Sequence, residues 1–355
     1  KDLILSKVLT LQQNGFYKLN TSLCDYHSAL IGIFNDEFIS LFGPRRFSDE
    51  KPTENHLNLA SSVQAAFEET LEHILKPVTI NYPQIKNIVL TGGCALNVTA
   101  NGKLIKSKTF REIVIPPAPH DAGCAIGAGI CHLKEECDLS SIGNPYLGRG
   151  YTNVDISKEL FLYLKHYIKE IGEDELIETT AKLLSDGKLI AWFQGRSEFG
   201  PRALGSRSFL ADPRNDRIRD EINLKIKKRE LFRPFAPSIL EDSIDQFFDL
   251  YQLSPYMNMV ANVLNDSIPA VTHIDKTARV HTVSRKSNKR YYDLIDRFGK
   301  ITGIPVLLNT SFNIQEPIVY SPKDAIKTFI NSGVDALVIG DYIIRREDIS
   351  HSKCL

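Results

Sequence analysis

A basic segment in the second half of the chain carries the residue types best suited to chemistry on anions. Residues 196–233 hold eleven Lys or Arg against six Asp or Glu, in a protein whose formal net charge is zero. Forked guanidinium groups bind phosphate and carboxylate oxygens, and the Gly and Pro residues of GRSEFGPRALG (195–205) and FRPFAP (232–237) suit rigid loops. The segment therefore predicts a site for phosphate or carboxylate groups; a solvated basic helix and loop is the alternative.

A second candidate site is the pair Gly92-Gly93, which follows a short apolar strand and precedes a helix. Glycines let a ligand approach the backbone closely, and a helix start offers unpaired N–H groups and a positive dipole. Asn97 and Asn101, one turn apart, add neutral hydrogen-bonding groups. A tight turn that binds no ligand is the alternative.

The first part of the chain alternates between strands and helices, as in an α/β domain with ligands at the carboxyl ends of its strands. A helix with apolar residues at helical spacing is expected at Leu59–Leu75, with Pro77 ending it. A Gly- and Pro-rich segment at 142–152 reads as a linker. The other expected elements are a strand at 88–90, a helix at 95–105, a strand at 112–117, a turn at 117–123 and a helix ending at Ile130.

The second part of the chain is also expected to mix helices and strands. The basic segment directly follows one strand, and the loop Asn309–Asn313 follows another. The expected elements are helices at 156–171, 175–184 and 322–330, and strands at 189–193, 305–308 and 336–339.

Length and composition are those of an ordinary soluble protein. A chain of 355 residues predicts two domains, and 43% apolar with 24% charged residues allows a large core. Zero net charge gives no reason to expect nucleic acid or a membrane as partner. The six cysteines form no C-x-x-C pair and read as reduced thiols of a cytoplasmic protein. Self-association is compatible with this composition.

The wording of GRSEFGPRALGSRSFLADPR and KIKKRELFRPFAP closely resembles the signature of O-carbamoyltransferases of the NodU/CmcH type. The resemblance implies an α/β fold: the second half of an actin-like ATPase domain in residues 1–141, and a YrdC-like domain in 153–355. It covers the whole chain but only the later part of a family member. Lys1 opens the chain in place of Met, so we expect an N-terminal truncation.

The resemblance implies specific roles in the second domain. Arg202 in GPRAL, with Lys227 and Arg233 in KIKKRELFRPFAP, would contact carbamoyl phosphate and the phosphates of ATP during catalysis. Arg279 in TARV, with Asn309 and Ser311 in NTSFN, would add further contacts, although NTSFN also reads as a plain polar loop. Arg207, Lys228 and Arg229 are second choices for these contacts, and could instead pair with Asp212, Asp216 or Glu230.

In the first domain, the resemblance assigns Gly92, Gly93, Asn97 and Asn101 to the nucleotide. It makes Asp121 a ligand of iron or zinc; as the alternative, Asp121 is a good N-cap. The family's metal site also uses histidines, and none of the nine histidines here has another four residues away. One carboxylate does not hold a transition metal well, so we expect this chain alone to lack the metal and the final transfer step.

The function implied is ATP-dependent carbamoyl transfer. Carbamoyl phosphate and ATP, with Mg²⁺, would give carbamoyl-adenylate in the YrdC-like domain, and the carbamoyl group would pass to a small hydroxyl-bearing acceptor at the actin-like domain. Two alternatives remain open. One is a tRNA threonylcarbamoyladenosine-type enzyme, which the lack of a strongly basic surface disfavours; the other is a remnant that binds nucleotide without catalysis.

Overall fold

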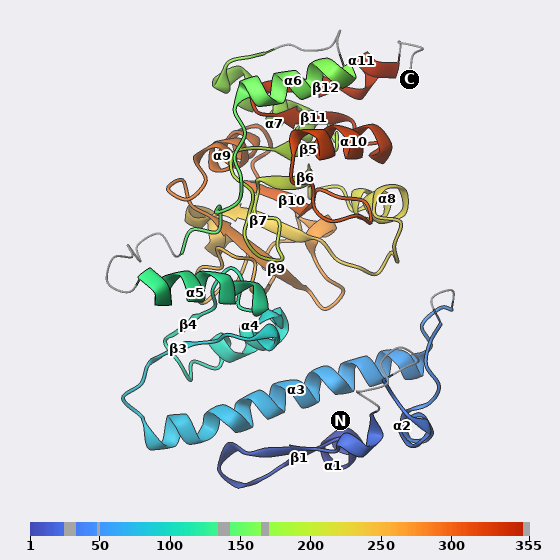
Figure 1. The fold of residues 1–355 in the computed structure, drawn as a ribbon, viewed down its shortest axis with the longest axis vertical. Helices are drawn as coiled ribbons and strands as arrows, with labels where there is room; N and C mark the ends of the chain where they lie inside the picture. The colour runs from blue at the N-terminus through green and yellow to red at the C-terminus, as the bar shows by residue number, and fades with distance from the viewer. Residues whose placement is uncertain (25–32, 48–49, 134–142, 165–169, 351–355) are drawn as a thin grey trace. The chain divides into compact units, whose positions relative to one another are not determined.

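The computed structural model describes residues 1–24, 33–47, 50–133, 143–164 and 170–350 (Figure 1). The chain forms two compact units. The first comprises Lys1–Ile88 with Ser107–Glu112, and the second comprises Val89–Lys106 with Ile113–Leu355. The predicted boundary at 142–152 stays a prediction, and residue 142 lies outside the described residues.

The first unit contains one long helix, α3, at Glu54–Asn81. Thr53 and His56 form a capping box at its start. A hairpin lies against this helix, and His73 Nε2 is 3.0 Å from the carbonyl oxygen of Phe16 in that hairpin. The other elements are α1 (Asp2–Lys7), β1 (Leu9–Leu11), η1 (Gln13–Gly15), β2 (Tyr17–Leu19), η2 (Thr21–Leu23) and α2 (Asp36–Phe42).

The prediction that Pro77 ends this helix is wrong. Pro77 lies inside α3, which continues to Asn81. A proline removes one backbone donor, but later residues keep theirs: the N–H of Tyr82 still donates to the carbonyl of Val78 over 2.9 Å. Pro77 also packs closely against Gly15 of the hairpin. Tertiary packing therefore carries the helix past the proline.

An eight-stranded mixed sheet forms the centre of the second unit, in the order β12-β11-β5-β6-β10-β7-β9-β8. The pairs β11–β5 and β7–β9 are parallel, and the other pairs are antiparallel. The strands are β5 (Ile190–Phe193), β6 (Arg207–Ala211), β7 (Ala236–Leu240), β8 (Met259–Asn262), β9 (Thr277–Val283), β10 (Val306–Ser311), β11 (Ala336–Ile339) and β12 (Tyr342–Arg345).

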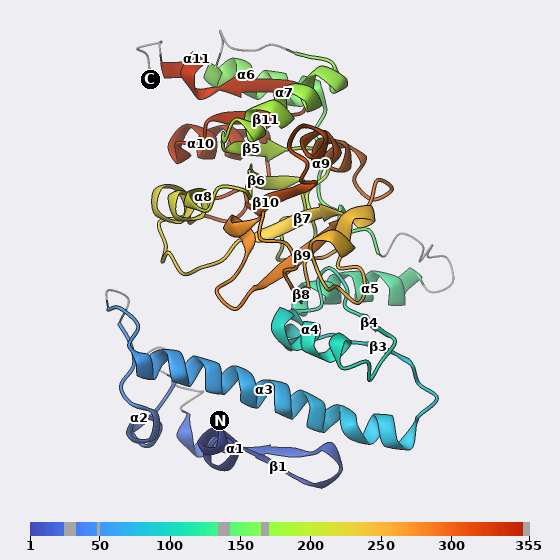
Figure 2. The same ribbon diagram turned by 180° about the vertical axis from the view of Figure 1, so that it is seen from behind.

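Helices cover both faces of this sheet (Figures 1 and 2). In β5, Ile190 and Trp192 pack with α7 and α9, whereas Ala191 and Phe193 pack with α6 and α10. Successive strand residues point to opposite faces, so an apolar run buried on both sides is the expected signature.

The helices of the second unit are α4 (Val98–Lys106), α5 (Cys124–Leu133), α6 (Asn153–Leu164), α7 (Glu173–Ser185), α8 (Arg217–Glu221), α9 (Lys289–Thr302), α10 (Pro322–Ser332) and α11 (Arg346–Ser350). Short 3-10 helices lie at η4 (Gly93–Leu96), η5 (Asp121–Gly123), η9 (Glu241–Gln246) and η10 (Pro269–Val271), and a short π-helix lies at η8 (Ile222–Ile226). Strand β3 (Asn87–Val89) pairs with β4 (Glu112–Val114).

Helix α4 is fixed to the edge of the sheet at β8. The side-chain amide of Asn101 is buried and donates to the carbonyls of Ala95 (2.8 Å) and Asn258 (2.9 Å). Gly102 lies against the carbonyl of Val260, where any side chain would overlap the backbone. The glycine therefore allows helix and strand to touch.

The predicted mixed α/β class is confirmed, and the predicted strand at Ala336–Ile339 is found with its predicted bounds. Strands β6, β7, β8 and β9 and helix α9 were not predicted. The actin-like and YrdC-like assignments stay predictions. Along the described residues, no helix combines the length and apolarity needed to cross a bilayer.

Because His281 on β9 is buried, the free energy of unfolding depends on pH in the acidic range. Burial lowers the pKa of His281 to about 3, against about 6.5 in the unfolded chain. Between these values the unfolded state binds more protons, so the free energy of unfolding falls as pH drops from about 6.5, by at most about 1.4 kcal/mol per pH unit. We expect His281→Asn, which retains an acceptor for Ser238, to show a flatter acid dependence. Urea unfolding from pH 4 to 7 measures this; an unchanged slope in the variant would contradict it.

Candidate anion-binding site

Four arginines line a pocket of about 500 Å³ in the second unit. Arg202 comes from the loop between β5 and β6, Arg229 and Arg233 from the segment before β7, and Arg279 from β9. Among the described residues, no Asp or Glu lines this pocket. Its other lining residues are Val98, Thr99, Pro201, Ala203, Pro234, Phe235, Ala236, Met257, Val260, His273, Asn309, Thr310 and Ser311.

The positive charge in this arginine pocket is largely uncompensated. Burial, together with the nearby positive charges of Arg202 and Arg229, lowers the pKa of Arg279 to about 9. The buried Nε of Arg279 has no hydrogen-bond partner among the residues described. Burial also lowers the pKa of Arg202. Arg233 differs, since its Nε lies 2.9 Å from the Glu230 carboxylate. Clustered cations with unmet donors are suited to bind an anion.

The loop that carries Arg202 is shaped by Glu198. One carboxylate oxygen of Glu198 accepts from the backbone N–H groups of Leu204 (2.7 Å), Ser206 (2.8 Å) and Arg207 (3.2 Å). Gly200 has a φ of 130° and lies against the carbonyl of Pro117, so the position excludes a side chain. Glu198 of the GRSEFGPRALG motif therefore fixes the conformation of the loop, a role that was not predicted from the sequence.

Lys227 lies behind the pocket and not on its lining. Its Nζ lies within hydrogen-bond distance of the carbonyl and hydroxyl oxygens of Ser311 (2.5 and 3.1 Å) and of the carbonyl and side-chain oxygens of Asn313 (2.8 and 2.9 Å). Burial lowers the pKa of Lys227 to about 7, and the Arg229 charge adds to this shift. Lys227 thus holds the end of β10, where Ser311 reaches the pocket.

Asn309 lines the pocket from within the sheet. The predicted loop Asn309–Asn313 is a strand up to Ser311, which corrects that prediction. Pairing with both neighbours, Leu210 of β6 and Ala236 of β7, outweighs the loop preference of these polar residues. The Asn309 amide donates to the carbonyl of Ala203 and to Ser238 Oγ, each over 3.0 Å.

Arg207 lies outside the pocket lining. Its buried guanidinium stacks 3.6 Å from the Phe193 ring and donates to the carbonyls of Gln194 (2.8 Å), Ser206 (3.0 Å) and Gly195 (3.1 Å). Burial lowers the pKa of Arg207 to about 10. The structure therefore gives this side chain backbone partners and does not bring it to the other arginines.

The predicted nucleotide residues Gly92, Gly93, Asn97 and Asn101 do not line the arginine pocket. Asn97 Oδ1 accepts from the N–H of Ala100 at the start of α4, and Gly92 has a φ of 88°. The first residues of α4, Val98 and Thr99, do line the pocket. The predicted segment therefore forms one wall of the arginine pocket through Val98 and Thr99, which were not predicted as site residues.

Asp121 is exposed at the start of η5. Within the described part of the chain, no three His, Cys, Asp or Glu side chains come close enough together to hold a metal. The described residues therefore do not by themselves fit a transition metal, which normally needs three or more protein ligands.

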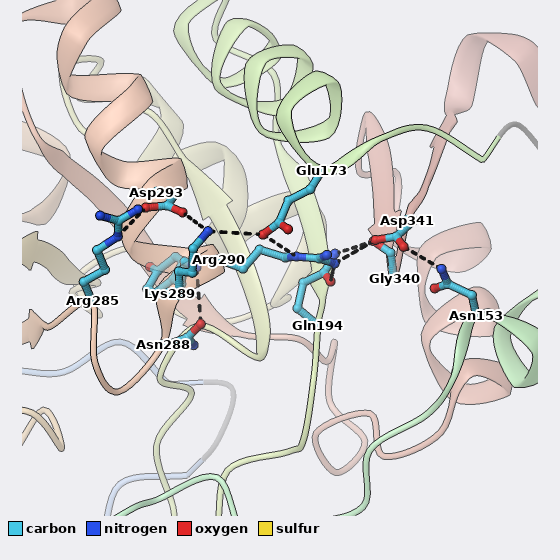
Figure 3. Close-up of polar contacts among 11 residues, drawn as sticks. Asn153, Glu173, Gln194, Arg285, Asn288, Lys289, Arg290, Asp293, Gly340 and Asp341 are labelled. Carbon is cyan, nitrogen blue, oxygen red and sulfur yellow. Dashed lines mark hydrogen bonds and ion pairs between the residues drawn. The ribbon is translucent and has the colours of Figure 1, made fainter.

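A second pocket of about 480 Å³ lies where the parallel strands β5 and β11 end. Three of its charged lining residues, Lys289, Arg290 and Asp341, are paired within the protein, as Figure 3 shows. Arg196, also in the lining, donates to the backbone carbonyls of Gly148 and Leu147. Arg290 Nη1 lies 2.9 Å from Asp341, and Asn153 donates to the same carboxylate over 2.5 Å. Lys289 pairs with Asp293 over 2.7 Å. This pocket therefore has less unpaired positive charge with which to bind an anion than the arginine pocket has.

Two family models match the chain. The carbamoyltransferase N-terminus model covers residues 1–130, and the carbamoyltransferase C-terminus model covers residues 181–346. The arginines of the pocket fall in the second range, and Val98 and Thr99 fall in the first.

Curated relatives agree with this match. The chain is 43% identical to nodulation protein NolNO of Sinorhizobium fredii (84% of this chain, 45% of the relative) and 41% identical to nodulation protein NolO of Bradyrhizobium diazoefficiens (84% and 56%). It is 34% identical to the uncharacterized protein MJ1051 of Methanocaldococcus jannaschii (96% and 68%). The chain spans 45% to 61% of the length of three of the curated relatives that it matches. By these matches and its arginine-rich motifs, the chain belongs to the carbamoyltransferase family.

Proposed function

We propose that the arginine pocket binds carbamoyl phosphate and the phosphates of ATP, and forms carbamoyl-adenylate. The observation that carries this proposal is the group of Arg202, Arg229, Arg233 and Arg279 around a cavity lined by no described carboxylate. Carbamoyl phosphate is a small dianion, and ATP adds further negative oxygens. A pocket of about 500 Å³ suits a small-molecule site.

The chemistry needs fixed positive charge at two steps. Water cleaves carbamoyl phosphate to carbamate and inorganic phosphate. A carbamate oxygen then attacks the α-phosphorus of ATP, and the bond from that phosphorus to the departing pyrophosphate breaks. Both partners of the second step are anions, so cations held in place before reaction lower their repulsion and stabilise the developing charge.

Transfer of the carbamoyl group to a small hydroxyl-bearing acceptor is proposed for the whole protein. In this chain Asp121 is the predicted metal ligand, and the described residues form no group of three ligands that could hold a metal. The tRNA-modifying alternative is not favoured, since both matching family models are carbamoyltransferase models.

Replacing Arg279 with Gln should separate binding from stability. We expect affinity for carbamoyl phosphate to fall about 10- to 100-fold, because a charge-assisted hydrogen bond contributes about 1.5–3 kcal/mol. We also expect the unliganded variant to melt at the same or a higher temperature, since the substitution removes a buried donor without a partner and relieves repulsion from Arg202 and Arg229. Calorimetric titration and thermal unfolding measure the two effects.

Arg285→Gln is the matched control, because it removes the same charge from an exposed side chain paired with Asp293. It should leave carbamoyl phosphate affinity unchanged. Equal affinity losses in the two variants would mean that net charge, and not the pocket, governs binding. A clear drop in melting temperature for Arg279→Gln would assign Arg279 a structural role.

The adenylate-forming step predicts an isotope exchange. Labelled pyrophosphate should enter ATP only when carbamoyl phosphate is present, because exchange requires reversible formation of carbamoyl-adenylate. Arg202→Gln should slow this exchange at least about tenfold through the loss of one charged contact. Exchange at the same rate without carbamoyl phosphate, or exchange driven by threonine and bicarbonate, would contradict the proposal.

A further inference from the structure

His273 lines the arginine pocket but has no role in the function proposed so far. It lies between η10 and β9, and its backbone N–H donates to the carbonyl of Thr277 over 2.8 Å. Its Nε2 atom is buried and has no hydrogen-bond partner in the described part of the chain. A buried polar atom left unsatisfied costs free energy unless a ligand completes it.

Hydrogen bonds fix which ring nitrogen of His273 carries the proton. The Asp275 carboxylate accepts from the backbone N–H of Thr277 (3.1 Å) and from its hydroxyl (2.7 Å). Because the hydroxyl proton is used there, Thr277 Oγ1 must accept from His273 Nδ1, which lies 3.1 Å away. In the neutral ring Nε2 is then an acceptor with a lone pair.

The neutral form of His273 is favoured in the folded protein. Burial lowers the pKa of His273; Asp275 opposes this shift, and Arg279 adds to it. The ring is therefore uncharged near pH 7, and its Nε2 is an acceptor among guanidinium groups that only donate.

A ligand that satisfies all these groups must carry both acceptors and a donor. The four guanidinium groups suit the oxygens of a phosphate or a carbonyl. His273 Nε2 requires an N–H or O–H group on the same ligand. The side-chain oxygen of Asn309 is also buried, with no partner within the described ranges, and is a second such acceptor. Carbamoyl phosphate combines phosphate oxygens with an NH₂ group, whereas acetyl phosphate has a methyl group in its place.

We propose that His273 is a specificity-determining residue whose Nε2 accepts a hydrogen bond from the NH₂ group of carbamoyl phosphate. This inference rests on the proposed function, because it assumes that carbamoyl phosphate occupies the arginine pocket. A site built to hydrogen-bond an NH group rejects an analogue that lacks it, since the buried acceptor would stay unpaired. His273 thus separates carbamoyl from acetyl donors, while the arginines bind the phosphate of either.

Binding of three anions to three proteins tests this assignment. Dissociation constants are measured for carbamoyl phosphate, acetyl phosphate and inorganic phosphate with the wild type, His273→Leu and His273→Gln. We expect the wild type to prefer carbamoyl over acetyl phosphate at least about tenfold. His273→Leu should bring this ratio close to one by weakening carbamoyl phosphate alone. His273→Gln, which retains a side-chain acceptor, should recover part of the preference, and thermal unfolding confirms that each variant is folded.

The outcomes distinguish this inference from the proposed function. If both organic phosphates bind the wild type equally well, or if His273→Leu weakens all three anions by the same factor, His273 does not read the NH₂ group and the proposed function stands. If no anion binds the wild type, the proposed function itself fails. Should His273→Leu not fold, His273→Gln decides: a preference for carbamoyl over acetyl phosphate as large as that of the wild type overturns the inference.

Discussion

Repulsion between like charges is the constraint on which the second unit depends. Arg202 and Arg229 lie close enough to Arg279 for their positive charges, together with its burial, to lower its pKa. Of the residues that the structure describes, no Asp or Glu lines the cavity to cancel their charge. Such a cluster is costly in the absence of a ligand, so the surrounding structure must hold each cation in place before the anion arrives. The energy stored in this arrangement is returned on binding, as in other preorganised sites.

The framework that holds the cations uses polar groups turned toward the backbone. Glu198 gathers three N–H groups of the loop that carries Arg202. Lys227 secures the end of β10 through Ser311 and Asn313, and the Asn309 amide ties β10 to Ala203 and β7. Charged and polar residues of the same motifs therefore divide between two tasks: some shape the cavity and others face into it.

The sequence was a good guide to where the charges gather, since the motifs around Arg202, Arg229, Arg233 and Arg279 all reach one pocket. It did not distinguish Lys227 from Arg229, two residues away in the same motif. The difference depends on contacts with Ser311 and Asn313, 84 and 86 residues later. The left-handed backbone at Lys228, with a φ of 47°, is a further local feature that the residue type does not announce.

Strand assignments failed for the same reason. The residues RSFLA of β6 and TARVHTV of β9 carry arginines or a histidine within strands that are mostly buried, and only pairing with distant strands makes them regular. His273 escaped attention because a lone histidine is unremarkable in sequence. Its tautomer is fixed by Thr277 and Asp275, and its Nε2 atom is buried without a partner among the described residues only in the folded pocket.

The attachment of α4 to β8 bears on how the protein can be dissected. Val98 and Thr99 belong to the range matched by the N-terminal family model, yet they line the same cavity as arginines matched by the C-terminal one. An expression fragment started in the gap between the two matched ranges would lose this wall and uncover the edge strand at Val260, where Gly102 now packs. Exposed strand edges promote aggregation. Fragment boundaries for this family are therefore better chosen upstream of Val89, where the compact unit begins.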